Sequence, residues 1–219
     1  MVQIRKYQPK DRDDVINICW KTGYMGDDSA GHFDDRYLFG LLFCLYYVDY
    51  EPENCFVAVD EDRDKAIGYV LSSLNSEKQE KQFRKKIIPK IIRRAFLYTI
   101  WRYHRTFRVF WHFKKTFQEA REPSHNESLL APYPAHLHID ILPQYHRQGV
   151  GTKLMRCLES HFRTHNVKGA HLGTSEKNEK AIPFYKKLGY SVIYEGPSGY
   201  GMWPDAPEVR ELILAKKYD

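Results

Sequence analysis

A pair of glycines at the start of a helical pattern is the motif whose chemistry is easiest to state. The residues read YHRQGVGT over 145–152, between an alternating pattern at 136–142 and an amphipathic pattern at 149–166. Glycines leave the first amides of a helix unobstructed, and those amides, at the positive end of the helix dipole, bind phosphate groups. His146 and Arg147 add positive charge beside them. The motif predicts a pyrophosphate site, and the alternative is a turn that needs only the flexibility of glycine.

Two familiar nucleotide motifs fail at this turn. A dinucleotide fingerprint needs a third glycine where Leu154 stands, and an acidic residue about 20 positions further on, where His171 stands. A Walker motif needs lysine directly after the glycine, but Thr152 separates Gly151 from Lys153. The turn therefore indicates neither a dinucleotide-binding fold nor a Walker-type nucleotide site.

Three ionisable residues alternate along the strand pattern before the turn. His136, His138 and Asp140 share one face of that strand, and a buried apolar face would not tolerate them unpaired. They could form a proton relay, because histidine titrates near neutral pH, or a structural network that stiffens the strand. The spacing supplies no third ligand, so no metal site is predicted.

The elements that must position these residues follow from the hydrophobic periodicity. Strands are expected at 2–8, 55–61, 65–74, 136–142, 169–175, 190–196 and 209–218, and helices after Asp11 and at 33–50, 149–166 and 178–189. The stretch 122–134 is expected to be a loop. This order predicts an α/β (α+β) fold over 1–219, a single domain with a mixed central sheet flanked by helices.

A basic, aromatic-rich segment interrupts this order between the third and fourth strands. Residues 76–121 hold 14 lysines and arginines against three acidic residues, a net charge of +11, whereas the rest of the chain carries −5. Its spacing predicts a helical insertion over 76–128, broken at Pro89. Binding to nucleic acid or to an anionic surface is one interpretation. We favour an insertion with solvated charges that acts as a lid or as a subunit contact in a homodimer; a nucleic-acid partner is not expected.

Composition excludes several classes. No apolar run approaches the roughly 20 residues that span a bilayer, and the first residues lack the apolar core of a signal peptide. Four cysteines without a CxxC pair suit reduced thiols, so we expect a cytoplasmic protein without a zinc knuckle or a disulfide scaffold.

Two motifs together resemble the GNAT superfamily of acyl-CoA-dependent N-acetyltransferases. The turn 146–151, read HRQGVG, is similar to the family's Q/R-x-x-G-x-G/A, with histidine in the first position as a departure. The family's second motif, N-x-x-A-x-x-F-Y-x-x-x-G-F/Y, is matched by Asn178, Ala181, Phe184, Tyr185, Gly189 and Tyr190. More narrowly, 34–42, 53–76 and 133–143 resemble the acetyltransferase-like domain of animal O-GlcNAcases and its free-standing bacterial relatives.

The resemblance implies an enzyme that moves the acetyl group of acetyl-CoA to a primary amine by direct attack on the thioester. The cofactor-binding residues that it implies are Ile141, Leu142, His146, Arg147, Gln148, Gly149, Val150, Gly151, Thr152, Asn178, Ala181 and Tyr185. The acceptor, a small-molecule or peptide amine, is not specified. A non-catalytic recognition module of the same fold is the alternative.

Catalytic roles follow from the same resemblance. Tyr185 matches the general acid, although it could instead be a packed aromatic, with Phe184 expected to be the more buried of the two. A backbone N–H within 140–142 would polarise the thioester carbonyl, and the base would come from the histidine and aspartate residues of the strand. Asp34, Asp35 and Tyr37 would attract the amine in the acceptor pocket, or else serve as charge at a helix N-terminus.

Overall fold

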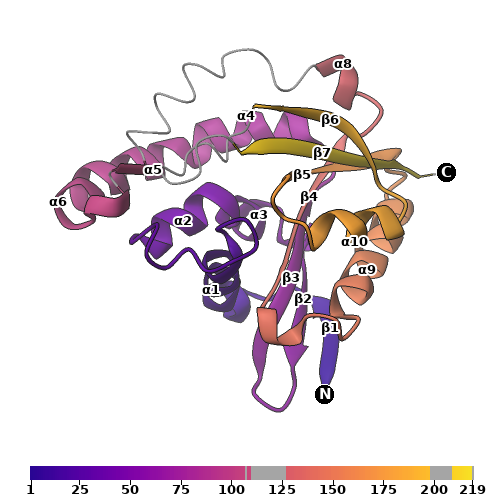
Figure 1. Cartoon of the computed structure of the whole chain (residues 1–219), viewed down its shortest axis with the longest axis horizontal. Helices are drawn as coiled ribbons and strands as arrows, with labels where there is room; N and C mark the ends of the chain where they lie inside the picture. The colour runs from indigo at the N-terminus through magenta and orange to yellow at the C-terminus, as the bar shows by residue number, and fades with distance from the viewer. Residues whose placement is uncertain (107, 110–126, 198–208, 219) are drawn as a thin grey trace.

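Seven strands form one mixed sheet in the computed structural model, which describes residues 1–106, 108–109, 127–197 and 209–218. The strands are β1 (Val2–Lys6), β2 (Phe56–Asp60), β3 (Lys65–Ser73), β4 (Ala135–Ile141), β5 (Gly169–Ser175), β6 (Ser191–Pro197) and β7 (Arg210–Lys217). Their order is β1-β2-β3-β4-β5-β7-β6, and only β4 and β5 run parallel. The predicted mixed α/β fold is confirmed (Figure 1).

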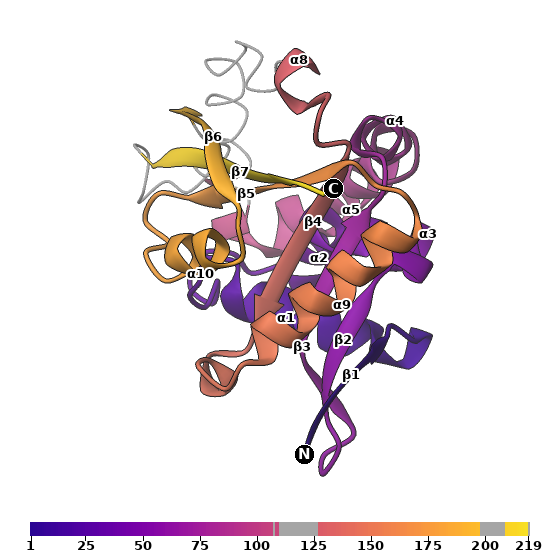
Figure 2. The same ribbon diagram turned by 90° about the vertical axis from the view of Figure 1, so that its right-hand side faces the viewer.

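Helices cover both faces of this sheet, as Figure 2 shows with α9 in front and α1 and α2 behind. One face carries α1 (Arg12–Thr22), α2 (Arg36–Phe43) and α3 (Leu45–Tyr50), and the other carries α9 (Val150–Thr164) and α10 (Ala181–Lys187). Short helices η1 (Pro9–Asp11), η2 (Pro52–Asn54), α8 (Glu127–Leu130) and η4 (Pro143–Tyr145) lie in the connections. Among the described residues, no helix combines the length and the apolar composition needed to cross a bilayer.

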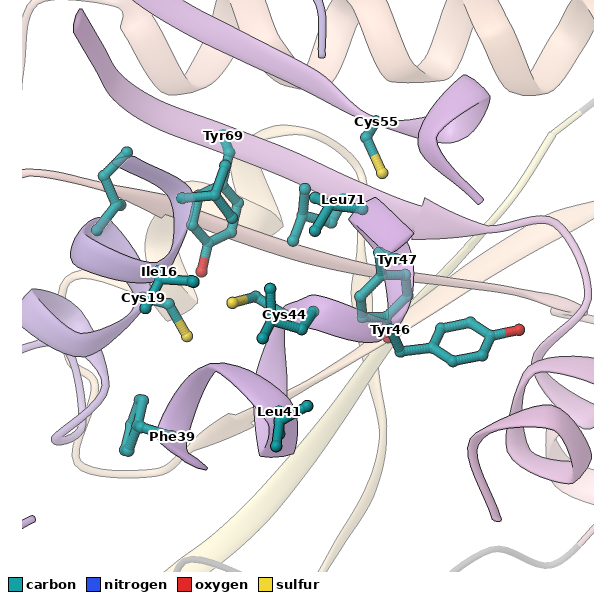
Figure 3. Packing of buried hydrophobic residues seen from close by; sticks show 14 of the residues in the cluster. Ile16, Cys19, Phe39, Leu41, Cys44, Tyr46, Tyr47, Cys55, Tyr69 and Leu71 are labelled. Carbon is teal, nitrogen blue, oxygen red and sulfur yellow. The ribbon is translucent and has the colours of Figure 1, made fainter. Parts of the chain in front are cut away.

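Each face has its own core because each helix presents one apolar stripe. On α9, Val150, Leu154 and Leu158 recur every four residues and are at most 2% exposed. On the other face, Figure 3 shows side chains of α1, α2 and α3 packed against Tyr69 and Leu71 of β3. The sheet is therefore a middle layer between two apolar cores.

Three boundaries differ from the expected ones. The helix expected over 33–50 is two helices, because Cys44 leaves the helical region with φ −126°, and this bend buries Leu41 and Leu45 completely. The helix expected from position 178 begins at Ala181. The short helix α8 lies inside the expected loop, of which residues 122–126 lie outside the described part of the chain.

The insertion between β3 and β4 is helical as far as the structure describes it. It contains α4 (Ser76–Lys86), α5 (Ile88–Arg94), a π-helical turn η3 (Ala95–Thr99) and α6 (Ile100–Arg102), and the arm projects to the left of Figure 1. The break expected at Pro89 is present, because α4 ends one residue before Ile87 and α5 begins one residue after it. In the second half of the insertion, also predicted to be helical, Phe96 lies in η3, and Ile100 and Trp101 lie in α6. The other aromatic residues predicted for this half, Phe107, Phe110, Trp111 and Phe117, lie outside the described residues.

Part of the insertion is anchored and part is exposed. Ile87 and Ile91 are buried in the core beside α2, at 0% and 6% exposure. The large apolar side chains that face solvent are Ile88, Ile92, Phe96, Leu97, Tyr98, Ile100 and Trp101. This exposed stripe suits the subunit contact expected from the sequence, and the homodimer stays a prediction.

A buried ion pair joins the insertion to the start of α2. Arg94 donates to both oxygens of Asp35, at 2.9 and 3.1 Å, and Thr99 donates at 2.9 Å. The same carboxylate caps α2 by accepting from the Leu38 amide at 3.1 Å. Hydrogen bonding to Asp35 raises the pKa of Arg94 above its ordinary value. We call this arrangement the Asp35 clamp.

Arg94→Ala should destabilise the protein by about 3 kcal/mol, because it leaves the buried Asp35 carboxylate without its cation. The neighbouring Arg93 is exposed, so Arg93→Ala should change stability by no more than about 0.5 kcal/mol. Urea unfolding of both variants checks this. Equal midpoints for the two would show that the clamp adds nothing to stability.

Candidate active site

The open edge of β4 is the first feature of the site. Six residue pairs join β4 to β3, but only Ala135–Ala170 and His136–His171 join it to β5. Beyond these pairs, β5 leaves with β7 and β6, and Figure 2 shows the two halves of the sheet fanning apart. The backbone of β4 from position 137 onward thus faces a widening gap on its β5 side.

The register shows which backbone groups face that gap. The Leu142 amide donates to the Ile67 carbonyl on β3, at 2.9 Å. Alternate residues of an antiparallel strand direct their N–H and C=O to opposite sides, so Ile139 and Ile141 direct theirs toward the gap. Of the polarising amides predicted within 140–142, the geometry favours that of Ile141.

The glycine turn follows directly from this edge. Arg147 and Gly149 have positive φ, at 59° and 76°, and Gly149 caps α9 in the left-handed conformation. A Cβ on Gly149 would meet no atom within 4 Å, so its backbone is open on that side. The first amides of α9, those of Val150, Gly151 and Thr152, have no partner within the helix. The turn therefore fits the predicted phosphate group.

The second glycine has a different role. A Cβ on Gly151 would lie 3.1 Å from both the Ile141 and the Phe184 side chains, so the position is closely packed. Its small size allows the end of β4, the start of α9 and helix α10 to meet. Gln148, also predicted to bind the cofactor, donates its side-chain amide to the Gln144 carbonyl at 2.9 Å and so stabilises the turn.

His146, the departure from the family motif, bends back onto the strand. Its Nε2 lies 2.8 Å from the Ile141 carbonyl oxygen and must donate, because a carbonyl only accepts. The side chain thus satisfies one of the two groups that Ile141 directs toward the gap. The substitution leaves the amides of the turn itself unaffected.

The three alternating residues of β4 do share one face, but they form two groups. His138 Nε2 lies 3.3 Å from the Asp140 carboxylate, which also accepts from the Tyr69 hydroxyl at 2.5 Å. His136 instead contacts Tyr47, with 2.6 Å between its Nδ1 and the hydroxyl. These contacts therefore do not connect all three residues in a single proton relay.

Three partners of this face were not predicted from the sequence: Tyr47, Tyr69 and His171. Tyr69 pairs with Asp140 across the β3–β4 register, and the ring of His171 lies 5.1 Å from that of His136. His171 donates through Nδ1 to the Tyr133 carbonyl at 2.8 Å. Only the pairing of distant strands brings these groups together.

The second family motif lies beside the turn. Tyr185 is 7% exposed, whereas Phe184 is only partly buried, so the expected order of burial was wrong. The reason is that Phe184 packs over Gly151 at the edge of the core. Ala181 starts α10, and Asn178 accepts from its amide at 3.0 Å. The Asn178 side chain lies against Gly26 in the α1–α2 connection.

The residues predicted for the acceptor pocket contact the insertion instead. Asp35 is 1% exposed and its carboxylate is fully engaged in the Asp35 clamp, so it offers no open contact for an amine. Asp34 accepts from the Arg105 amide at 3.2 Å, and its own amide donates to Thr106. The Tyr37 ring lies under the Arg94 guanidinium, at 5.3 Å from centroid to Cζ. Asp35 therefore serves as a charge at the N-terminus of α2, the alternative given for it from the sequence.

This combination of fold and turn defines a class. The chain belongs to the acetyltransferase (GNAT) family, whose model matches residues 17–190. Membership of this family confirms the enzyme class predicted from the two motifs.

Two individual proteins show a more extensive similarity. The chain is 28% identical over 194 residues to Protein O-GlcNAcase of Mus musculus, and the matched region covers 85% of this chain and 20% of the relative. It thus spans about a fifth of the length of the curated relatives that it matches. The crystal structure of SsHAT superposes with a TM-score of 0.74 and 28% identity, covering 99% of this chain and 98% of that one.

A more remote structure shows the fold alone. Polyamine N acetyltransferase of Drosophila melanogaster has a TM-score of 0.59 and 13% identity, with complete coverage of both chains (100% each). The resemblance to GNAT enzymes and to the O-GlcNAcase region is confirmed at the level of family and fold.

Asp140→Asn should change how stability depends on pH. Burial raises the pKa of Asp140 above its ordinary value, despite the opposing effects of His138 and Tyr69. The unfolded chain loses this proton first, near pH 4, so the carboxyl costs stability as pH rises from there through its folded pKa. In urea unfolding, the free energy of unfolding of the variant should rise relative to that of the wild type between pH 4 and 7. If the difference in free energy of unfolding between variant and wild type did not vary with pH, the pKa of Asp140 would not be raised in the folded protein.

Proposed function

We propose that this chain transfers an acetyl group from acetyl-CoA to a primary amine carried by a small molecule or a peptide. One observation carries the proposal: the open edge of β4 leads directly into the glycine turn and the free amides of α9. An extended edge followed by an anion site suits a ligand that joins an amide-bearing arm to a pyrophosphate.

The residues present fit acetyl-CoA. The amides at 149–152 and the charge of Arg147 would hold its phosphates, while the backbone of Ile139 would pair with its amide-bearing arm. When bound, acetyl-CoA supplies the acetyl group as an activated thioester. The alternative to phosphate binding is a turn that needs only the flexibility of glycine. That alternative gives no reason for the open β4 edge beside the turn.

The chain's own groups then have separate tasks. The Ile141 amide donates toward the gap, where a carbonyl oxygen gaining negative charge would be stabilised. Tyr185 donates a proton to the departing sulfur, for which a phenol is suitable. The His138–Asp140–Tyr69 group holds or passes protons on the opposite face of β4 from α9.

Saturating acetyl-CoA should raise the melting temperature, since 100-fold excess over Kd contributes about 2.7 kcal/mol. Gly149→Ala should weaken this binding at least tenfold, because a side chain would enter the open backbone of the turn. Gly31→Ala is the matched control: its φ of 93° and open surroundings impose similar strain away from the turn. Calorimetry without any heat for the wild type would overturn the proposal.

Tyr185→Phe should lower kcat about 100-fold and leave the Kd of acetyl-CoA unchanged, because only the proton donor is lost. Tyr190→Phe is the control, since it removes the hydroxyl of a neighbouring buried tyrosine that bonds Tyr218 at 2.7 Å. Steady-state kinetics with an amine from an acetylation screen provides the measurement. Equal turnover by the wild type and Tyr185→Phe would remove Tyr185 from the mechanism.

A further inference from the structure

Glu211, near the start of β7, is a carboxylate that no role described so far requires. It pairs with Ser175 of β5, two positions from the Gly173–Ile213 pair and four from the His171–Ala215 pair. Directly paired residues share a face, and His171 pairs with His136. Glu211 therefore lies on the same face of the sheet as the His138–Asp140–Tyr69 group.

The carboxylate leans over β5 toward the gap. Its Oε1 lies 2.8 Å from the position that a Cβ on Gly173 would occupy, so the absence of a side chain there makes room for it. Continued parallel pairing from His136–His171 would set Gly173 opposite His138, at the point where β4 and β5 separate. Glu211 thus reaches across the strand that borders the gap.

Nothing among the described residues pairs with this carboxylate. Its neighbour Arg210 contacts Glu195 at 2.8 Å and projects from the other face of β7. Burial raises the pKa of Glu211 to about 7, the described residues place no charge beside it, and the side chain keeps partial exposure. A half-buried carboxylate without a donor or a cation costs free energy, which suggests a ligand that supplies both.

We propose that Glu211 receives the ammonium group of the acceptor amine and accepts its first proton, an inference that rests on the proposed function. One N–H bond of the ammonium breaks, its electron pair stays on nitrogen, and an O–H bond forms on Glu211. The neutral amine is then able to attack, and the proton passes from Glu211 to water through its exposed side. Glu211 is thereby a catalytic residue on β7, distinct from the groups on β4.

This assignment narrows the acceptor class. Aliphatic amines arrive as ammonium ions at neutral pH and need both a counter-charge and a base. Aromatic amines such as aniline arrive neutral and need neither. The site is therefore built for aliphatic amines, including lysine side chains and free amino termini.

Carbon-13 NMR of the glutamate carboxyl groups in the full chain tests the inference without any catalytic turnover. One resonance should titrate near pH 7, disappear in Glu211→Gln, and shift to a lower midpoint when n-butylammonium chloride is added. The counter-charge favours the ionised carboxylate, which gives the sign of that shift. A Glu211 midpoint near the ordinary value for glutamate, insensitive to butylammonium, would overturn the proposal.

Kinetics supplies the second test. Glu211→Gln should lower kcat/KM for n-butylamine at least tenfold, abolish the rise of kcat/KM through pH 7, and leave both aniline acetylation and acetyl-CoA binding unchanged. Gly173→Ala, which displaces the carboxylate without removing it, should produce a smaller loss of the same kind.

Glu195→Gln is the matched control, because this carboxylate is 46% exposed on β6 and pairs with Arg210. It should behave as the wild type. An equal loss in Glu195→Gln, or full activity of Glu211→Gln with n-butylamine, would overturn the assignment. Failure of the proposed function is a separate result, seen as wild-type protein that does not bind acetyl-CoA.

Discussion

The brief parallel pairing of β4 with β5 is the constraint on which the rest of the structure depends. In a parallel ladder, alternate residues of each strand bond to the neighbouring strand, and here the ladder stops after two pairs. The seven pairs between β5 and β7 and the six between β3 and β4 hold the two halves of the sheet apart. The backbone of β4 beyond these pairs is thereby left without a strand on its β5 side, while helices pack on both faces of the sheet.

The turn that follows β4 meets two requirements that are difficult to combine. The chain must reverse tightly, which the positive φ of Arg147 and Gly149 achieves, and it must leave its amides unsatisfied. His146 resolves part of this conflict, because its ring satisfies the Ile141 carbonyl and leaves the amides free. A residue that departs from the family motif therefore performs a positioning task at the edge of the strand.

Local signals were sufficient for most of the fold and for the glycine turn. The alternation at 136–142 and the four-residue repeat of α9 depend only on neighbours in sequence, so the sequence predicts them well. Asp35 could not be interpreted in this way, because its cation lies 59 positions further along the chain, within the insertion. The grouping of Asp140 with Tyr69, and the position of Glu211 over Gly173, depend on strand register. Sequence shows which groups can do chemistry, whereas register decides which of them meet.

The Asp35 clamp has a consequence for motion. Because one carboxylate both caps α2 and holds Arg94, the first turn of α2 and the insertion cannot open independently at low cost. They form one cooperative unit for hydrogen exchange, and local unfolding of either should expose the amides of both. Because α2 packs on the face of the sheet that carries Tyr69, the insertion contacts the same helical layer that covers the His138–Asp140–Tyr69 group. The buried Asp35 carboxylate thus adds a polar link between the insertion and the interior to the apolar one made by Ile87 and Ile91.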